Sequence, residues 1–193
     1  MPADILPETA PSRRRIVEWS DPALVAKAGQ GLDGLAFLRA MMAGEVPPPP
    51  LIALLGIDLV CADLGRVTMR MGPGEYLYNP LGSVHGGALA SLLDSVMGCA
   101  VHSTLPLGRG YTTLEIKVNY LRAVTAASGP LTAVGEIVHA GRRQAVAEAR
   151  LTDGTGRLCV TASTTCLLLD RPVQGDAAPP AADPLLKAWT RIS

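Results

Sequence analysis

The most informative stretch of this chain is Asn79-Pro80-Leu81-Gly82-Ser83-Val84-His85-Gly86-Gly87. It leads into an apolar run that carries a single acidic residue, Asp94. Glycines at a helix entrance leave backbone N–H groups uncovered, and the helix dipole there favours an oxygen that gains negative charge. A buried carboxylate is costly unless it is compensated, so chance placement of Asp94 is improbable. The stretch therefore predicts an active site at the start of a long helix.

Periodicity around this stretch predicts an α+β domain. Apolar side chains recur almost all round a helix over 84–104, which indicates that it is buried: Leu89, Leu92, Leu93, Val96, Met97, Ala100 and Val101. Alternating patterns predict strands over 57–60, 67–71, 112–121, 131–139, 144–151 and 158–169. Within 112–121 the alternation predicts Leu114, Ile116 and Val118 on one side. We expect a strongly bent antiparallel sheet wrapped around one long central helix.

The two ends of the chain differ in composition from this domain. Residues 1–50 are expected to form a tail, mobile to about residue 18, and then a helical extension over 20–45. Glycines at 29, 31 and 34 weaken that helix, and the prolines at 47–50 stop it. The main domain is predicted over 51–170, and an Ala/Pro-rich C-terminal tail over 171–193.

The composition argues against several classes of partner. Lys and Arg number 17 and Asp and Glu number 17, so no net charge attracts nucleic acid or a membrane surface. Aromatic residues make up 4%, too few for base-stacking platforms. We find no apolar stretch long enough to span a bilayer and no secretory signal. The four cysteines form no CxxC pair, so we expect free thiols and a cytoplasmic location.

The spacing along the helix also predicts a homodimer. Gly86 and Asp94 are eight residues apart, which corresponds to about 12 Å of helix. A carbonyl held by the Gly86 amide must lie about 3 Å from it. Asp94 of the same helix cannot easily reach that carbonyl, whereas Asp94 of a second, antiparallel helix can. If both residues act on one substrate, the working unit is a dimer with two composite sites.

The same residues resemble a known family. Asn79, His85-Gly86-Gly87 and Asp94, at spacings of six and nine, resemble the signature of the PaaI-like acyl-CoA thioesterases of the hotdog-fold superfamily. The resemblance continues through Thr112-Thr113-Leu114-Glu115-Ile116-Lys117-Val118-Asn119-Tyr120-Leu121-Arg122. Many relatives have proline at the next position, where this chain has Ala123, a difference at a turn. The resemblance implies the hotdog fold and a homodimer, which pairs into a tetramer in many relatives.

The resemblance also implies thioester hydrolysis without a metal or organic cofactor. The Gly86 amide would polarise the thioester carbonyl and hold the developing oxyanion. Asp94 would act as general base on a water molecule, or attack the carbonyl itself. Asn79 would orient the water or the thioester, and Thr113, or its neighbour Thr112, would help to hold the water.

Further residues are candidates for binding. Coenzyme A carries several phosphate charges, and Arg142 and Arg143, beside a predicted turn, are the best candidates to meet them, with Arg122 next. Gly87 is a second candidate for contact with substrate. His85 could take part in catalysis, but the stronger interpretation is that it fixes the loop.

Two other functions are compatible with the pattern. A non-catalytic acyl-CoA-binding module is disfavoured because binding alone needs no carboxylate at Asp94. A hydroxyacyl-thioester dehydratase needs a histidine and an acid on either side of the substrate. Nine residues place His85 and Asp94 on opposite faces of a helix, which disfavours that reaction. His102 and His139 share no metal-ligand spacing with His85, so a zinc site is not expected.

Overall fold

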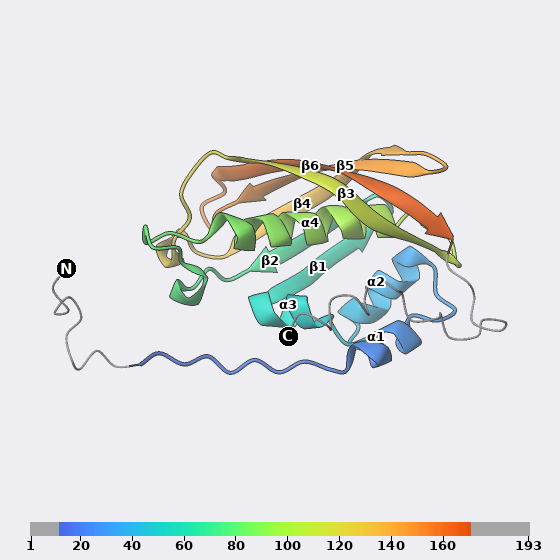
Figure 1. Cartoon of the computed structure of the whole chain (residues 1–193), viewed down its shortest axis with the longest axis horizontal. Coiled ribbons are helices and arrows are strands. Elements are labelled where there is room, and N and C mark those ends of the chain that lie inside the picture. Colours follow the sequence, from blue (N-terminus) through green and yellow to red (C-terminus); the bar gives the residue numbers. More distant parts are fainter. Residues whose placement is uncertain (1–11, 171–193) are drawn as a thin grey trace, which may run out of the picture.

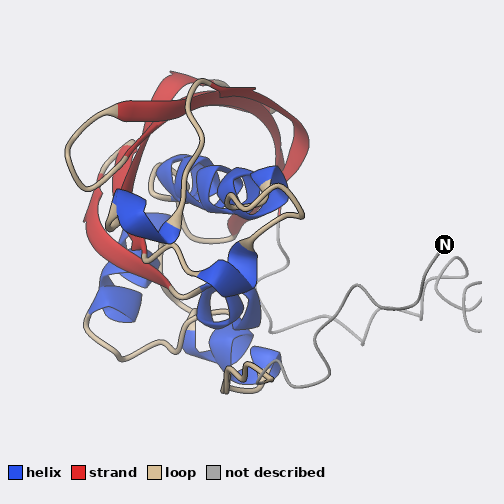
Figure 2. Ribbon diagram, turned by 90° about the vertical axis from the view of Figure 1, so that its left-hand side faces the viewer, coloured by secondary structure: helices blue, strands red, loops and turns tan. Residues whose placement is uncertain are grey.

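The helix predicted around Asp94 is present as α4 (Gly86–His102), and an antiparallel sheet curves around it (Figure 1, Figure 2). The computed structural model describes residues 12–170. The strands are β1 (Ile57–Asp63), β2 (Arg66–Met71), β3 (Arg109–Tyr120), β4 (Leu131–Ala140), β5 (Gln144–Thr152) and β6 (Leu158–Asp170). Their order in the sheet is β1-β2-β4-β5-β6-β3, so β1 and β3 are its edges. The predicted bent sheet around a central helix is confirmed.

The core lies between α4 and the concave face of the sheet. Leu92, Leu93 and Val96 are fully buried there. Helix and sheet come so close that a methyl group added at Gly135 of β4 would lie 2.6 Å from the carbonyl oxygen of Val96. Burial of the apolar face of α4, rather than helix propensity, therefore holds the helix in place.

Strand β3 departs from simple alternation. Its pairing with β6 shifts between Thr113 and Glu115, which leaves Leu114 as an extra residue in a β-bulge. Leu114 is 53% exposed, whereas Ile116 and Val118 pack against the core. The prediction that these three residues share one side is wrong, because the bulge changes the alternation at this point.

The N-terminal extension is helical but interrupted. The predicted helix over 20–45 is two helices, α1 (Pro22–Ala28) and α2 (Gly34–Met42), capped by Asp21 and Asp33. A third helix, α3 (Pro50–Leu55), was not predicted; it begins at a proline, which the first helical position tolerates. A 3₁₀ turn, η1 (Glu75–Leu77), precedes the loop that enters α4.

Part of the segment predicted to be mobile makes contacts. Arg13 forms an ion pair with Glu75, and the guanidinium of Arg15 lies 4.0 Å from the centre of the Tyr76 ring. This segment therefore lies against η1. The expected tails over 1–11 and 171–193 lie outside the described residues.

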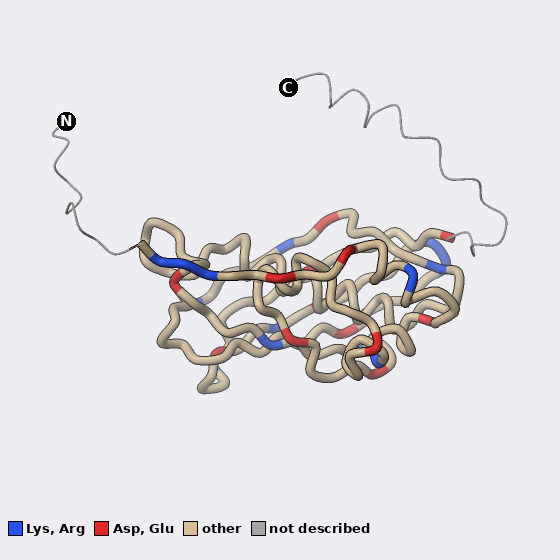
Figure 3. The backbone as a smooth tube through the Cα atoms, turned by 90° about the horizontal axis from the view of Figure 1, so that it is seen from below, with Lys and Arg blue, Asp and Glu red and all other residues tan. Residues whose placement is uncertain are grey.

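Charged residues and cysteines are distributed as the composition led us to expect. Lys, Arg, Asp and Glu are interspersed along the backbone, apart from the run of arginines at 13–15 (Figure 3). The four cysteines, Cys61, Cys99, Cys159 and Cys166, are free, as predicted. None of the helices in the described part of the chain is long and apolar enough to cross a membrane.

Candidate active site

The start of α4 presents one backbone amide to its surroundings. The loop before it is held by the His85 amide, which donates to the Leu77 carbonyl at 2.7 Å. The His85 side chain caps the helix, because its Nδ1 accepts the Gly87 N–H at 2.8 Å. Within residues 12–170, the Gly86 N–H has no acceptor. Gly86, rather than Gly87, therefore offers the donor that the sequence predicted here.

Asn79 organises the turn that leads to this amide. Its Oδ1 accepts the Leu81 N–H at 2.9 Å and the Ser83 N–H at 3.3 Å. Its Nδ2 donates to the Ser83 hydroxyl at 3.2 Å. Gly82 adopts φ +79°, a left-handed conformation that favours glycine. The Asn79 side chain thus shapes the loop, as asparagine commonly does in turns.

A pocket of about 360 Å³ lies between this loop and the end of β3. Asn79, Gly86, Tyr120 and Arg122 are among its lining residues. The Tyr120 hydroxyl donates to the Gly86 carbonyl at 2.8 Å. A methyl group added at Gly86 would lie 3.0 Å from that ring, so the close approach depends on glycine. Sequence reasoning did not identify Tyr120, since only its place at a strand end distinguished it.

Asp94 lies farther along α4 and is partnered by β3. The Thr113 hydroxyl donates to Asp94 Oδ1 at 2.9 Å. Thr112 is exposed and makes no hydrogen bond of its side chain within the described residues. Of the two candidate threonines, the structure therefore brings Thr113 to the carboxylate. Burial and the negative charge of Asp94 raise the pKa of the nearby Cys99 thiol to about 12, so this cysteine is protonated at neutral pH.

A single chain does not unite the two halves of the candidate site. Gly86 and Asp94 lie two turns apart on α4, and the pocket at Gly86 includes neither Asp94 nor Thr113. The amide donor and the carboxylate therefore occupy separate positions in one chain.

The three predicted arginines lie in two different places. Arg122 lines the pocket at Gly86, and its guanidinium donates to the Leu158 carbonyl. Arg142 and Arg143 are exposed at the turn between β4 and β5. Their backbone carbonyls accept hydrogen bonds from Arg109, at 3.0 Å, and from the Leu168 amide, at 2.8 Å. Only Arg122 is in the same pocket as Gly86.

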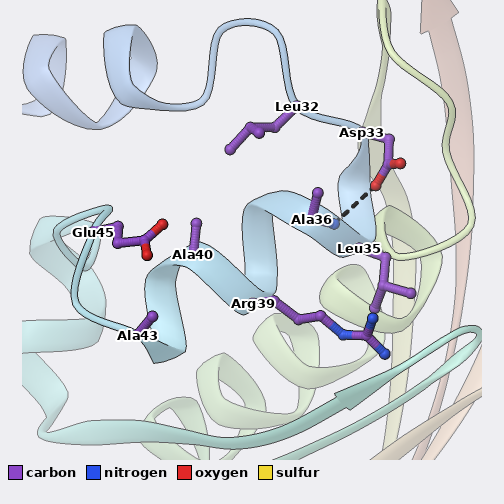
Figure 4. A pocket seen from close by; sticks show the side chains of 8 residues that line it. All are labelled: Leu32, Asp33, Leu35, Ala36, Arg39, Ala40, Ala43 and Glu45. Atoms are coloured by element: carbon purple, nitrogen blue, oxygen red, sulfur yellow. Dashed lines mark hydrogen bonds between the residues drawn. The ribbon is translucent and has the colours of Figure 1, made fainter.

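A larger cavity, of about 530 Å³, lies along α2 and contains none of the predicted site residues (Figure 4). Its Asp33 carboxylate is engaged as the cap of α2 and accepts the Ala36 N–H at 2.8 Å. Across residues 12–170, no group of three or more His, Cys, Asp or Glu side chains could hold a metal ion. We place the candidate active site at the smaller pocket because it holds the unpartnered amide.

This architecture defines a class of protein. One long helix enclosed by a bent antiparallel sheet is the hotdog arrangement. The solved E. coli PaaI protein of the phenylacetic acid degradation operon has the same fold, with a TM-score of 0.62 at 22% identity, covering 77% of this chain and 97% of that one.

Sequence comparison identifies the family. Residues 81–160 match the family model of the thioesterase superfamily. The proofreading thioesterase EntH of Cronobacter turicensis is 32% identical over 111 residues, or 58% of this chain and 80% of EntH. A hypothetical thioesterase protein of Streptococcus pneumoniae, solved with coenzyme A, is 30% identical with a TM-score of 0.55, over 60% of this chain and 90% of that one. This chain belongs to the thioesterase superfamily, and it is a thioester hydrolase. Its fold is the hotdog fold of PaaI.

Proposed function

We propose that the protein hydrolyses an acyl-CoA thioester to the free acid and coenzyme A, at a site built across a dimer interface. The observation that carries this proposal is the Gly86 amide, which is unpartnered at the positive end of α4 within the described residues. Coenzyme A bound to the similar S. pneumoniae protein supports the choice of leaving group.

The proposed reaction uses Gly86 from one chain and Asp94 from its partner. The Gly86 N–H polarises the thioester carbonyl and then binds the oxyanion. Asp94 accepts a proton from the attacking water, or attacks the carbonyl carbon directly. In this second route the C–S bond breaks with release of coenzyme A, and water then hydrolyses the resulting anhydride to free the acid and regenerate Asp94. In the first route, water adds to the carbonyl, the C–S bond breaks, and the proton passes to the departing CoA sulfur. The Thr113 hydroxyl, already bonded to Asp94, orients the carboxylate and the water.

The remaining candidates have supporting roles in this proposal. Asn79 shapes the loop and lines the same pocket as Gly86, where its side chain can orient the thioester or the water. His85 and Gly87 form the cap of α4, so the Gly86 N–H is left as the donor for the substrate. Arg122 meets a CoA phosphate at the pocket. Arg142 and Arg143 are further candidates for that role.

The proposed activity predicts thiol release from acyl-CoA by the purified wild-type protein. A thiol-reactive chromophore follows coenzyme A continuously, and chromatography follows the free acid. We expect equal amounts of thiol and acid, with no added metal. Tight binding of acyl-CoA without thiol release would instead identify a binding module. Formation of an unsaturated acyl-CoA from a hydroxyacyl-CoA would identify a dehydratase.

The composite site predicts complementation between two inactive variants. Gly86→Pro removes the amide donor, and Asp94→Asn removes the carboxylate. Heterodimers isolated through two different affinity tags contain one site with both functional groups, so we expect about half of the wild-type activity. Each variant alone stays nearly inactive. Heterodimers as inactive as the parents would show that each site is built within one chain.

A further inference from the structure

Beyond Asp94, the same face of α4 leads to a cluster of rings. Asp94, Gly98 and His102 recur every four residues, so they lie on one face of the helix. Tyr111 of β3 lies against Gly98: a methyl group added at Gly98 would be 2.5 Å from the Tyr111 hydroxyl oxygen. This contact places the tyrosine ring one helical turn beyond Asp94, a distance of about 6 Å along the axis.

Strand β3 carries the ring and the partner of Asp94 together. Tyr111 and Thr113 are two residues apart, before the bulge, and therefore point to the same face of the strand. Thr113 reaches Asp94, and Tyr111 reaches Gly98. The two side chains thus contact the same face of α4, and Tyr111 does so nearer to the helix C-terminus.

The N-terminal extension supports the ring from behind. The His102 ring lies 5.9 Å from that of Tyr111 and 5.4 Å from that of Phe37 of α2, the latter edge to face at 89°. Helix α2 is fixed at this point because the Gly34 N–H donates to the Leu105 carbonyl at 2.9 Å. A methyl group at Gly34 would overlap the His102 carbonyl oxygen. The Tyr111 ring therefore has little room to move away from Asp94 toward α2.

The two directions along α4 from Asp94 differ in polarity. Toward the helix start lie the Ser91 hydroxyl, bonded to the Gly87 carbonyl at 2.9 Å, and the exposed loop. Toward the helix end lie Gly98 and Tyr111, which packs against the hydrophobic core. An apolar acyl group gains more by lying toward Tyr111, because apolar surface is removed from water there.

We propose that Tyr111, seated on Gly98 and supported through His102 by α2, is the end wall of the acyl-binding part of the site. The wall restricts the substrate to acyl groups that fit within about one helical turn of Asp94, which favours short chains over long ones. This proposal rests on the proposed function, since it concerns the acyl group of the same substrate.

Rates of thiol release from acyl-CoAs of increasing chain length test whether Tyr111 is the end wall. We expect wild-type kcat/KM to fall steeply from butyryl-CoA to decanoyl-CoA. Tyr111→Ala removes the ring, so the ratio of decanoyl-CoA to butyryl-CoA activity should rise by about tenfold or more. Tyr111→Phe keeps the ring and should keep the wild-type chain-length profile, which would show that the ring and not the hydroxyl sets the limit.

Gly98→Ala adds bulk next to Tyr111, whereas Tyr111→Ala removes it. The added methyl group must push the Tyr111 ring, so we expect kcat/KM for the longest accepted acyl group to fall more than that for acetyl-CoA. The melting temperature of each variant shows whether it is folded. If Tyr111→Ala is folded and its chain-length profile is that of wild type, Tyr111 does not limit the acyl group. If Tyr111→Ala does not fold, an unaltered profile in Gly98→Ala contradicts the proposal in the same way. A wild-type protein inactive on every acyl-CoA would instead refute the proposed function.

Discussion

Replacing Gly86 by proline is expected to lower kcat by about 100- to 1,000-fold, the usual cost of losing one oxyanion donor. Proline removes the N–H without breaking α4, because Gly86 is the first helical residue, where proline is tolerated. The preceding residue, His85, has φ −59° and ψ 134°, a conformation that a following proline accepts. The loss should therefore report on the donor. Thiol release at saturating acyl-CoA measures it.

Gly86→Ala is the matched control for this substitution. Alanine keeps the N–H but adds a methyl group that would lie 3.0 Å from the Tyr120 ring, as the proline side chain does. We expect the alanine variant to retain much more activity than the proline variant. Equal losses in the two variants would mean that crowding at Tyr120, and not the missing donor, lowers the rate.

Asp94→Asn is expected to lower kcat by about 100-fold or more, as when a general base is removed. Asparagine has nearly the same size and keeps an oxygen that can accept the Thr113 hydroxyl, so the packing of α4 against β3 should persist. Only the negative charge is lost, and both proposed routes need that charge. Asp58→Asn, at an exposed carboxylate of β1, is the control and should behave as wild type. Wild-type turnover by Asp94→Asn would remove this residue from the mechanism.

Local patterns were sufficient to predict much of the fold. The helix around Asp94 was predicted to within two residues at each end, because its apolar periodicity and the glycines at its start are properties of neighbouring residues. The alternation in β5 also matches the structure, with Ala145, Ala147, Ala149 and Leu151 buried. Helix α3 was missed because a run of prolines predicts an end to helix, while the last proline is compatible with a helix start.

Local patterns were therefore enough to predict the strands of the sheet and the long helix that carries Gly86 and Asp94, because alternation, helix periodicity and capping act within a few residues. Which threonine meets Asp94 depends instead on the packing of the whole chain, since the bulge in β3 arises from its pairing with β6. The same is true of the contact of Tyr120 with Gly86 and of the support that α2 gives to the ring next to Gly98. These contacts join segments tens of residues apart, and no local pattern specifies how far a strand slides or which rings meet across the core.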